Sequence, residues 1–110
     1  MLTKRNSLLV LLLILAGVAL AVSQQPAAGA NEIVIQNFAF EPATLTVKAG
    51  TKVTWVNRDD EPHTATATDK RFNSKTLENG ERFSMKFSQP GIYKYYCALH
   101  PKMTGQIVVK

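Results

Sequence analysis

The sequence predicts an all-β protein, an antiparallel β-sandwich that begins after an N-terminal apolar segment. Three observations predict this fold class. Apolar and polar residues alternate with a period of two through most of residues 32–110, turn-forming Gly, Pro and Asn residues recur between the alternating segments, and no stretch there has the period of an amphipathic helix. Short strands in this arrangement usually form two sheets packed face to face. The 110 residues of the chain are enough for one domain of modest size.

The first 30 residues have the features of a targeting segment. Lys4 and Arg5 precede an apolar run from Leu8 to Val22, which is 15 residues long. A membrane-spanning helix usually needs about 20 residues, so the first interpretation is a cleaved signal peptide. Small residues at positions 19–21 and 28–30 would suit a signal peptidase.

An uncleaved N-terminal membrane anchor is the alternative, and residues 23–30 would then be its linker. In both cases residues 31–110 form the domain. We therefore expect an exported protein that lies in the periplasm or at the extracytoplasmic face of the membrane.

The predicted domain has a small net positive charge. Without Lys4 and Arg5, the 13 basic residues of the chain become 11, against eight acidic residues. No Lys-rich or Arg-rich tract is present, which argues against a nucleic-acid partner. We expect a monomer whose acidic trio, Asp59 to Glu61, lies on a solvated loop.

The alternation predicts strands at residues 32–36, 44–48, 51–57, 63–68, 81–88, 92–97 and 104–110, with room for an eighth. Turn signals separate several of these strands, among them Ala49-Gly50, Asn79-Gly80 and Gln89-Pro90-Gly91. The second and third strands would form a core hairpin around Ala49-Gly50.

Period two also predicts which side chains face the core. The expected inward residues are Leu45, Val47, Val53, Trp55, Phe83, Met85, Phe87, Tyr93, Tyr95 and Cys97. Phe72 would anchor the loop at residues 69–74.

The most informative stretch runs from Tyr95 to Met103, because it gathers the only Cys, one of the two His residues and a Met. We expect Cys97 to end a strand, with His100 and Met103 on the loop that follows. The other histidine, His63, lies far upstream after Pro62, where loops at one pole of a sandwich could bring it close. Two His, one Cys and a weak axial Met are the ligands of a blue-copper electron-transfer site.

Other interpretations of these residues are weaker. Cys97 and Met103 would each, taken alone, more often be core residues. A structural zinc site prefers four Cys or His donors and uses Met poorly. A nucleophilic Cys97 with His100 as base would need a substrate pocket, which so small a domain does not suggest. One Cys also cannot form an internal disulfide, and a bound metal would explain an isolated thiol in an exported chain.

Residues 32–110 resemble the cupredoxins, the small type 1 blue copper proteins. The resemblance is carried by Phe40-x-Pro42, Gly50-x-x-Val53-x-Trp55-x-Asn57, Pro62-His63, Gly91-x-Tyr93-x-Tyr95-x-Cys97 and Gly105-x-Ile107-x-Val109. The spacing Cys97-x-x-His100-x-x-Met103 is similar to that of the amicyanin branch. Amicyanins usually have Pro at the position of Leu99 and Asn at the position of Thr64. We expect Thr64 to supply a hydroxyl group to the loop in place of the Asn side chain.

This resemblance implies an eight-stranded Greek-key sandwich that binds one copper ion through His63, Cys97, His100 and Met103. It also implies a carrier of single electrons, not an enzyme, with redox proteins such as a cytochrome or a dehydrogenase as donor and acceptor. We expect partners to dock at an apolar port around His100, formed by Ala98, Leu99, Pro101 and Phe38. The alternatives are a copper carrier or buffer that delivers Cu(I), and a β-sandwich interaction module without a metal.

Overall fold

The computed structural model describes residues 29–110. The predicted signal peptide or anchor falls on residues 1–30 and so lies almost entirely outside the described part of the chain. Within residues 29–110 no helix is long and apolar enough to cross a membrane.

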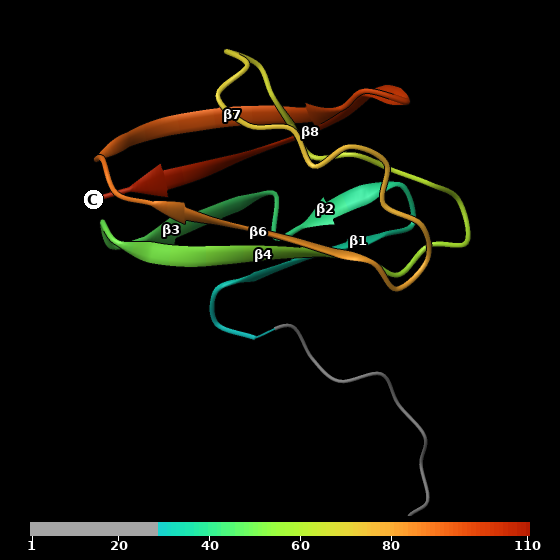
Figure 1. Cartoon of the computed structure of the whole chain (residues 1–110), viewed down its shortest axis with the longest axis horizontal. Helices are drawn as coiled ribbons and strands as arrows, with labels where there is room; N and C mark the ends of the chain where they lie inside the picture. The colour runs from blue at the N-terminus through green and yellow to red at the C-terminus, as the bar shows by residue number, and fades with distance from the viewer. Residues whose placement is uncertain (1–28) are drawn as a thin grey trace, which may run out of the picture.

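The described chain folds into eight strands, which confirms the predicted all-β sandwich. The strands are β1 (Glu32–Gln36), β2 (Ala39–Glu41), β3 (Thr44–Val47), β4 (Thr51–Asn57), β5 (Thr66–Ala67), β6 (Arg82–Phe87), β7 (Gly91–Cys97) and β8 (His100–Val109). One sheet has the order β2-β1-β4-β6 and the other has the order β3-β8-β7-β5. In Figure 1, β7 and β8 lie above β1, β4 and β6.

The sheets are mixed, whereas the sequence predicted antiparallel strands throughout. Strand β1 pairs with β4 in parallel, and β3 pairs with β8 in parallel, while the other pairs are antiparallel. The chain crosses repeatedly from one sheet to the other, and such crossovers can bring two strands together with the same direction. Periodicity reports which face of a strand is buried but not the direction of its neighbour.

The predicted core hairpin between the second and third long strands is wrong. The turn forms as expected, with the Thr51 N–H donating to the Lys48 carbonyl at 3.1 Å and Gly50 at a φ of 94°. However, β3 belongs to one sheet and β4 to the other, so this turn joins the two layers. Both strands still bury apolar side chains in the shared core, including Val47 and Val53.

Aromatic side chains fill the space between the sheets. Trp55 is completely buried and its ring contacts those of Phe72, Phe87 and Tyr95 at centroid distances of 5.4, 6.3 and 5.4 Å. Phe72, from the loop before β6, is buried as predicted. Large rings contribute most of the apolar area that a small core can bury, so this cluster holds the two layers in place.

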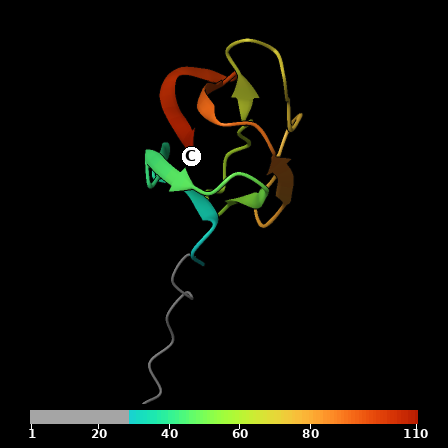
Figure 2. The ribbon, with the colours of Figure 1, turned by 90° about the vertical axis from the view of Figure 1, so that its left-hand side faces the viewer.

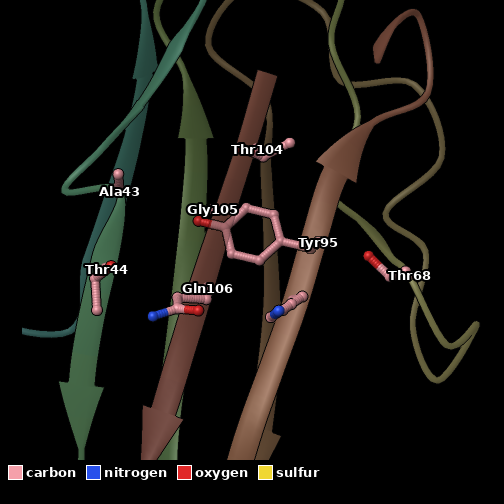
Figure 3. Close-up of a pocket in the computed structure, with 8 residues that line it drawn as sticks. Ala43, Thr44, Thr68, Tyr95, Thr104, Gly105 and Gln106 are labelled. Atoms are coloured by element: carbon pink, nitrogen blue, oxygen red, sulfur yellow. The ribbon is translucent and has the colours of Figure 1, made fainter. Parts of the chain in front are cut away.

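Gly105 gives the Tyr95 ring its place in the sandwich. The two residues face each other across the β7–β8 pair, and a Cβ on Gly105 would overlap the Tyr95 hydroxyl and ring. Figure 3 shows the ring lying against Gly105, in a surface pocket that contains none of the predicted metal ligands. The glycine is therefore needed for the close approach of a large side chain.

Candidate metal centre

Three of the four predicted ligands come together at one pole of the sandwich. The ligand atoms of His63, Cys97 and His100 all lie within 4.8 Å of one another. The Cys97 Sγ atom is 3.7 Å from Nδ1 of His63 and 3.7 Å from Nδ1 of His100. Both imidazoles therefore direct Nδ1 at the same sulfur. His63 lies 34 residues before Cys97 in the chain, and His100 lies three residues after it.

Cys97 and His100 are held by the connection between β7 and β8. Cys97 is the last residue of β7 and His100 is the first residue of β8, and the two are paired across a turn that contains Ala98 and Leu99. We predicted a loop for His100 and Met103, and this is wrong, since both belong to β8. The short turn allows β8 to pair with β7 at once, so the backbone of these donors is fixed by the sheet.

Met103 is the fourth predicted ligand, and it lies on the same strand as His100. Its side chain is buried, at 7% exposure. It lines one surface depression together with His100 and Phe38, which places it at the same pole as the other three residues. A buried thioether beside two imidazoles and a thiol is chemically suited to a weak axial position.

His63 is positioned by the long connection between β4 and β5. Its N–H donates to the Leu77 carbonyl at 3.1 Å, and the Leu77 N–H donates to the His63 carbonyl at 2.7 Å. The strand predicted for residues 63–68 is reduced to Thr66–Ala67 plus this isolated bridge. The small residues there allow extended backbone, but only two of them pair with β7.

Asp59 orients the His63 ring, a role that the sequence analysis missed. Its Oδ2 atom lies 2.8 Å from Nε2 of His63, on the side of the ring opposite Cys97. A carboxylate on one ring nitrogen fixes the tautomer and leaves the other nitrogen free to bind a metal. Asp59 is thus not the solvated loop residue that the sequence predicts, and its position four residues before His63 is the only signal of this role in the sequence.

The same carboxylate holds the segment between β1 and β2. Oδ1 accepts the Asn37 N–H at 2.7 Å, and Oδ2 accepts the Phe38 N–H at 2.9 Å. Desolvation alone would raise the pKa of Asp59, but the hydrogen bonds from Phe38, Asn37 and His63 outweigh it, so the pKa lies below its ordinary value. Asp59 is therefore charged at neutral pH and connects two loops of the site.

Asp59 thereby holds an aromatic ring over both histidines. Asn37 and Phe38 have φ values of 55° and 56°, a left-handed conformation that is unfavourable for side chains of this size. The Phe38 ring makes edge contacts with His63 at 5.1 Å and with His100 at 4.9 Å between centroids. Phe38 is 46% exposed, so its outer side faces solvent.

The Cys97 sulfur also receives a backbone hydrogen bond. The Thr64 N–H points at Sγ from 3.3 Å, and Cys97 itself is completely buried. An amide N–H stabilises a thiolate and withdraws electron density from it. Burial keeps external substrates away from the sulfur, which disfavours the nucleophilic interpretation of Cys97.

Thr64 supplies a hydroxyl to the loop, as predicted. Its Oγ1 atom accepts the Ala98 N–H at 2.7 Å and lies 2.9 Å from Oγ1 of Thr66. Thr64 therefore contacts the β7–β8 turn through its side chain and Cys97 through its backbone. One residue thus connects the His63 loop to the Cys97–His100 connection.

The donor set fits copper. Two imidazoles, a buried thiol that can bind as thiolate and a thioether combine soft sulfur with nitrogen, which suits both copper oxidation states. Within residues 29–110, fold and site together define a small β-sandwich with one group of side chains at one pole that could hold a metal ion.

Comparisons with known proteins agree with this class. The family described as "Cupredoxin-like domain" matches residues 8–109. Amicyanin-alpha of Methylorubrum extorquens is 35% identical over 101 residues, which cover 87% of this chain and 85% of that protein. The chain belongs to the cupredoxin family, and the predicted resemblance to its amicyanin-like branch is confirmed.

Solved structures lead to the same family. A purple cupredoxin from Nitrosopumilus maritimus aligns with a TM-score of 0.68 and 34% identity, covering 72% of this chain and 98% of that one. A mutant of amicyanin in its Cu(I) form aligns with a TM-score of 0.69 and 32% identity, covering 78% and 87%. The predicted class, a copper electron carrier and not an enzyme, is thereby confirmed at the level of the family.

Proposed function

We propose that His63, Cys97, His100 and Met103 hold one copper ion and that the chain carries single electrons between redox proteins outside the cytoplasm. Copper bound there would alternate between Cu(II) and Cu(I). The observation that carries the proposal is the convergence of two Nδ1 atoms on one buried sulfur, each at 3.7 Å.

The surrounding contacts favour a site that changes little between oxidation states. His63 is fixed by Asp59 on its far nitrogen, and by the Leu77 bridge on its backbone. Cys97 and His100 are fixed by the pairing of β7 with β8. Because these donors have little freedom to move, the reorganisation that accompanies gain or loss of an electron should be small.

The ligand roles can be tested with Met103→Gln. If Met103 is the weak axial donor, this variant should keep copper and change its reduction potential. A potential equal to that of the wild type would contradict the axial role. Thr104→Gln, which changes the exposed neighbouring residue, is the matched control and should leave the potential unchanged.

The port for electrons is proposed to be the exposed apolar surface beside His100. Phe38 is 46% exposed and Leu99 is 48% exposed, and with Pro101 they border the partly exposed His100. Apolar side chains of this size at one pole form a surface on which a partner can dock closely. Redox partners such as a cytochrome or a dehydrogenase would use this surface in turn.

Leu99→Glu tests the port. The variant should bind copper normally but exchange electrons more slowly with a partner protein, because a charge would have to be buried at the contact. Ile92→Glu is the control, since Ile92 is 58% exposed at the far end of β7. Equal rates in wild type and Leu99→Glu would place the port elsewhere.

The alternative function, delivery of Cu(I), has a different signature. An electron carrier should pass through repeated oxidation and reduction without losing its metal. A carrier of copper should release Cu(I) readily to a chelator. Measuring retained copper after redox cycling in the presence of a Cu(I) chelator distinguishes the two functions.

A further inference from the structure

Acidic residues are absent from two long parts of the sequence. Residues 42–58 and 82–110 contain no Asp or Glu, although they contain most of the lysines of the domain. The fold brings the two parts together at the end of the sandwich away from the metal centre. There the start of β4 pairs with the end of β6, and the end of β3 pairs with the end of β8.

Four exposed lysines gather at this end, and we name them the lysine pole: Lys48, Lys52, Lys86 and Lys110. Lys52 and Lys86 are directly opposite each other in the β4–β6 pair. Lys110 lies beside Lys48, because its carbonyl accepts the Ala49 N–H at 2.9 Å and its N–H donates to Val47 at 2.9 Å. Figure 2 faces this pole, where the C-terminus is marked.

The opposed lysines are unusual because nothing in the described part of the chain neutralises them. Directly opposite residues of an antiparallel pair share one face, and like charges there are destabilising. Within residues 29–110, none of the four lysines takes part in an ion pair. Because no acidic side chain of the described residues neutralises this repulsion between like charges, we expect the compensating negative charge to lie outside the protein.

The acidic residues gather instead at the metal end of the sandwich, although Arg58, Arg82 and Lys102 lie there as well. Asp59, Asp60 and Glu61 follow β4, and Glu78 and Glu81 lie next to them. The two segments are joined by hydrogen bonds from Asn79 Nδ2 to the Asp59 carbonyl at 2.9 Å and from the Asn57 N–H to the Glu81 carbonyl at 3.0 Å. Basic residues therefore lie at both ends of the domain, whereas this acidic cluster lies at the metal end alone.

The first described residues, which lead into β1, lie next to the lysines. Glu32 is paired with Thr54, and the Thr54 N–H donates to the Asn31 carbonyl at 3.0 Å. Thr54 lies two residues from Lys52, and so on the same face of β4. The sequence that precedes residue 29 contains the apolar run from Leu8 to Val22.

We propose that the lysine pole rests on an anionic lipid surface and thereby turns the metal end of the domain towards the aqueous phase. Lysines close to an anionic membrane are attracted to it, and the attraction fades within about 10 Å, a Debye length. The lysine pole would lie within this range, while the metal end, which carries charges of both signs, would gain no comparable attraction. The proposal goes beyond the electron-carrier function and does not depend on a bound metal.

The test uses the full chain, without metal, reconstituted into vesicles of phosphatidylcholine alone or with phosphatidylglycerol. Amide hydrogen exchange is then measured at the two turns of the lysine pole, residues 48–51 and 87–91. We expect exchange there to slow by about threefold or more on the anionic vesicles at low salt, and to return to the neutral-vesicle rate in about 1 M salt.

Lys52→Glu separates lipid binding from folding. It replaces a like-charge pair by an opposite-charge pair with Lys86, so thermal stability should not fall, while the protection by anionic lipid should be largely lost. Lys94→Glu is the control, with the same change of charge on an exposed residue opposite Gln106 in the other sheet. It should keep the protection.

Two results would overturn the proposal. Exchange that is the same on neutral and anionic vesicles would exclude lipid and leave an acidic protein surface as the partner of this pole. Equal loss of protection in Lys52→Glu and Lys94→Glu would show that net charge matters and the lysine pole does not. Neither result depends on copper binding, so both are independent of the proposed function.

Discussion

Asp59 and His63 are joined by a 2.8 Å hydrogen bond between the carboxylate and Nε2 of the ring. This bond leaves Nδ1 of His63 facing the Cys97 sulfur. The same carboxylate accepts the N–H groups of Asn37 and Phe38. One acidic side chain therefore connects a predicted ligand to the aromatic ring that covers the metal end of the domain.

Asp59→Asn should weaken copper binding by about 10-fold to 100-fold, because the neutral amide cannot support the His63 ring as a carboxylate does. The reduction potential should also rise, since a negative charge beside His63 stabilises the oxidised ion. Competition with a chelator and protein voltammetry measure the two effects. Asp60→Asn alters the exposed neighbouring carboxylate and should change neither quantity by a comparable amount.

Thr64→Val should reduce the free energy of unfolding of the metal-free protein by about 1–3 kcal/mol. The cause is the loss of the acceptor for the Ala98 N–H, which is bonded at 2.7 Å in the wild type. Urea denaturation measures the change. Thr68→Val is the control, because Thr68 is exposed and should tolerate the substitution. Equal stabilities of the two variants would show that the Thr64 hydroxyl does not support the β7–β8 turn.

Gly105→Ala should destabilise the fold by about 1–3 kcal/mol, since its Cβ would overlap the Tyr95 ring in a tightly packed core. Thermal unfolding followed by circular dichroism measures the effect. Gly29→Ala is the comparison, because a Cβ there would meet only Glu32 at an ordinary contact distance of 3.8 Å. A Gly105→Ala protein as stable as Gly29→Ala would mean that the ring moves aside without cost.

Tyr95 should make the domain sensitive to alkali. Burial raises the pKa of Tyr95, so its hydroxyl stays neutral in the folded protein while it ionises near pH 10 in the unfolded chain. Its contribution to stability is thus full below pH 10 and falls above it, by about 1.4 kcal/mol per pH unit.

Tyr95→Phe should remove this part of the pH dependence. The Tyr95 hydroxyl has no hydrogen-bond partner within residues 29–110, so the substitution should cost little at neutral pH. Urea denaturation at pH 8 and pH 11 measures both effects. A Tyr95→Phe protein that loses as much stability as the wild type between these pH values would exclude Tyr95 as the cause.

The sequence allowed the strands and their buried faces to be predicted, because alternation with a period of two is a local property. Tyr93, Tyr95 and Cys97 are all buried on one face, as expected. The assignment of β3 and β4 to different sheets could not be predicted in this way, since a turn between them is compatible with a hairpin or with a crossover. Strand partners depend on contacts between residues far apart in the chain.

The candidate ligands could be predicted because few residue types bind copper and the chain contains few of them. The role of Asp59 was not predicted, because its residue type gives no such indication. Acidic residues on loops are common, and only the fold shows that this one reaches both His63 and the Phe38 backbone. Supporting residues of this kind are defined by contacts in the folded protein, and the sequence pattern alone does not identify them.

The visible absorption spectrum during titration with Cu(II) tests the central claim most directly. The wild-type protein should develop an intense thiolate-to-copper band that saturates at one equivalent of copper, and Cys97→Ser should show no such band. A colourless complex in the wild type, or the same spectrum in Cys97→Ser, would contradict a copper centre built on Cys97.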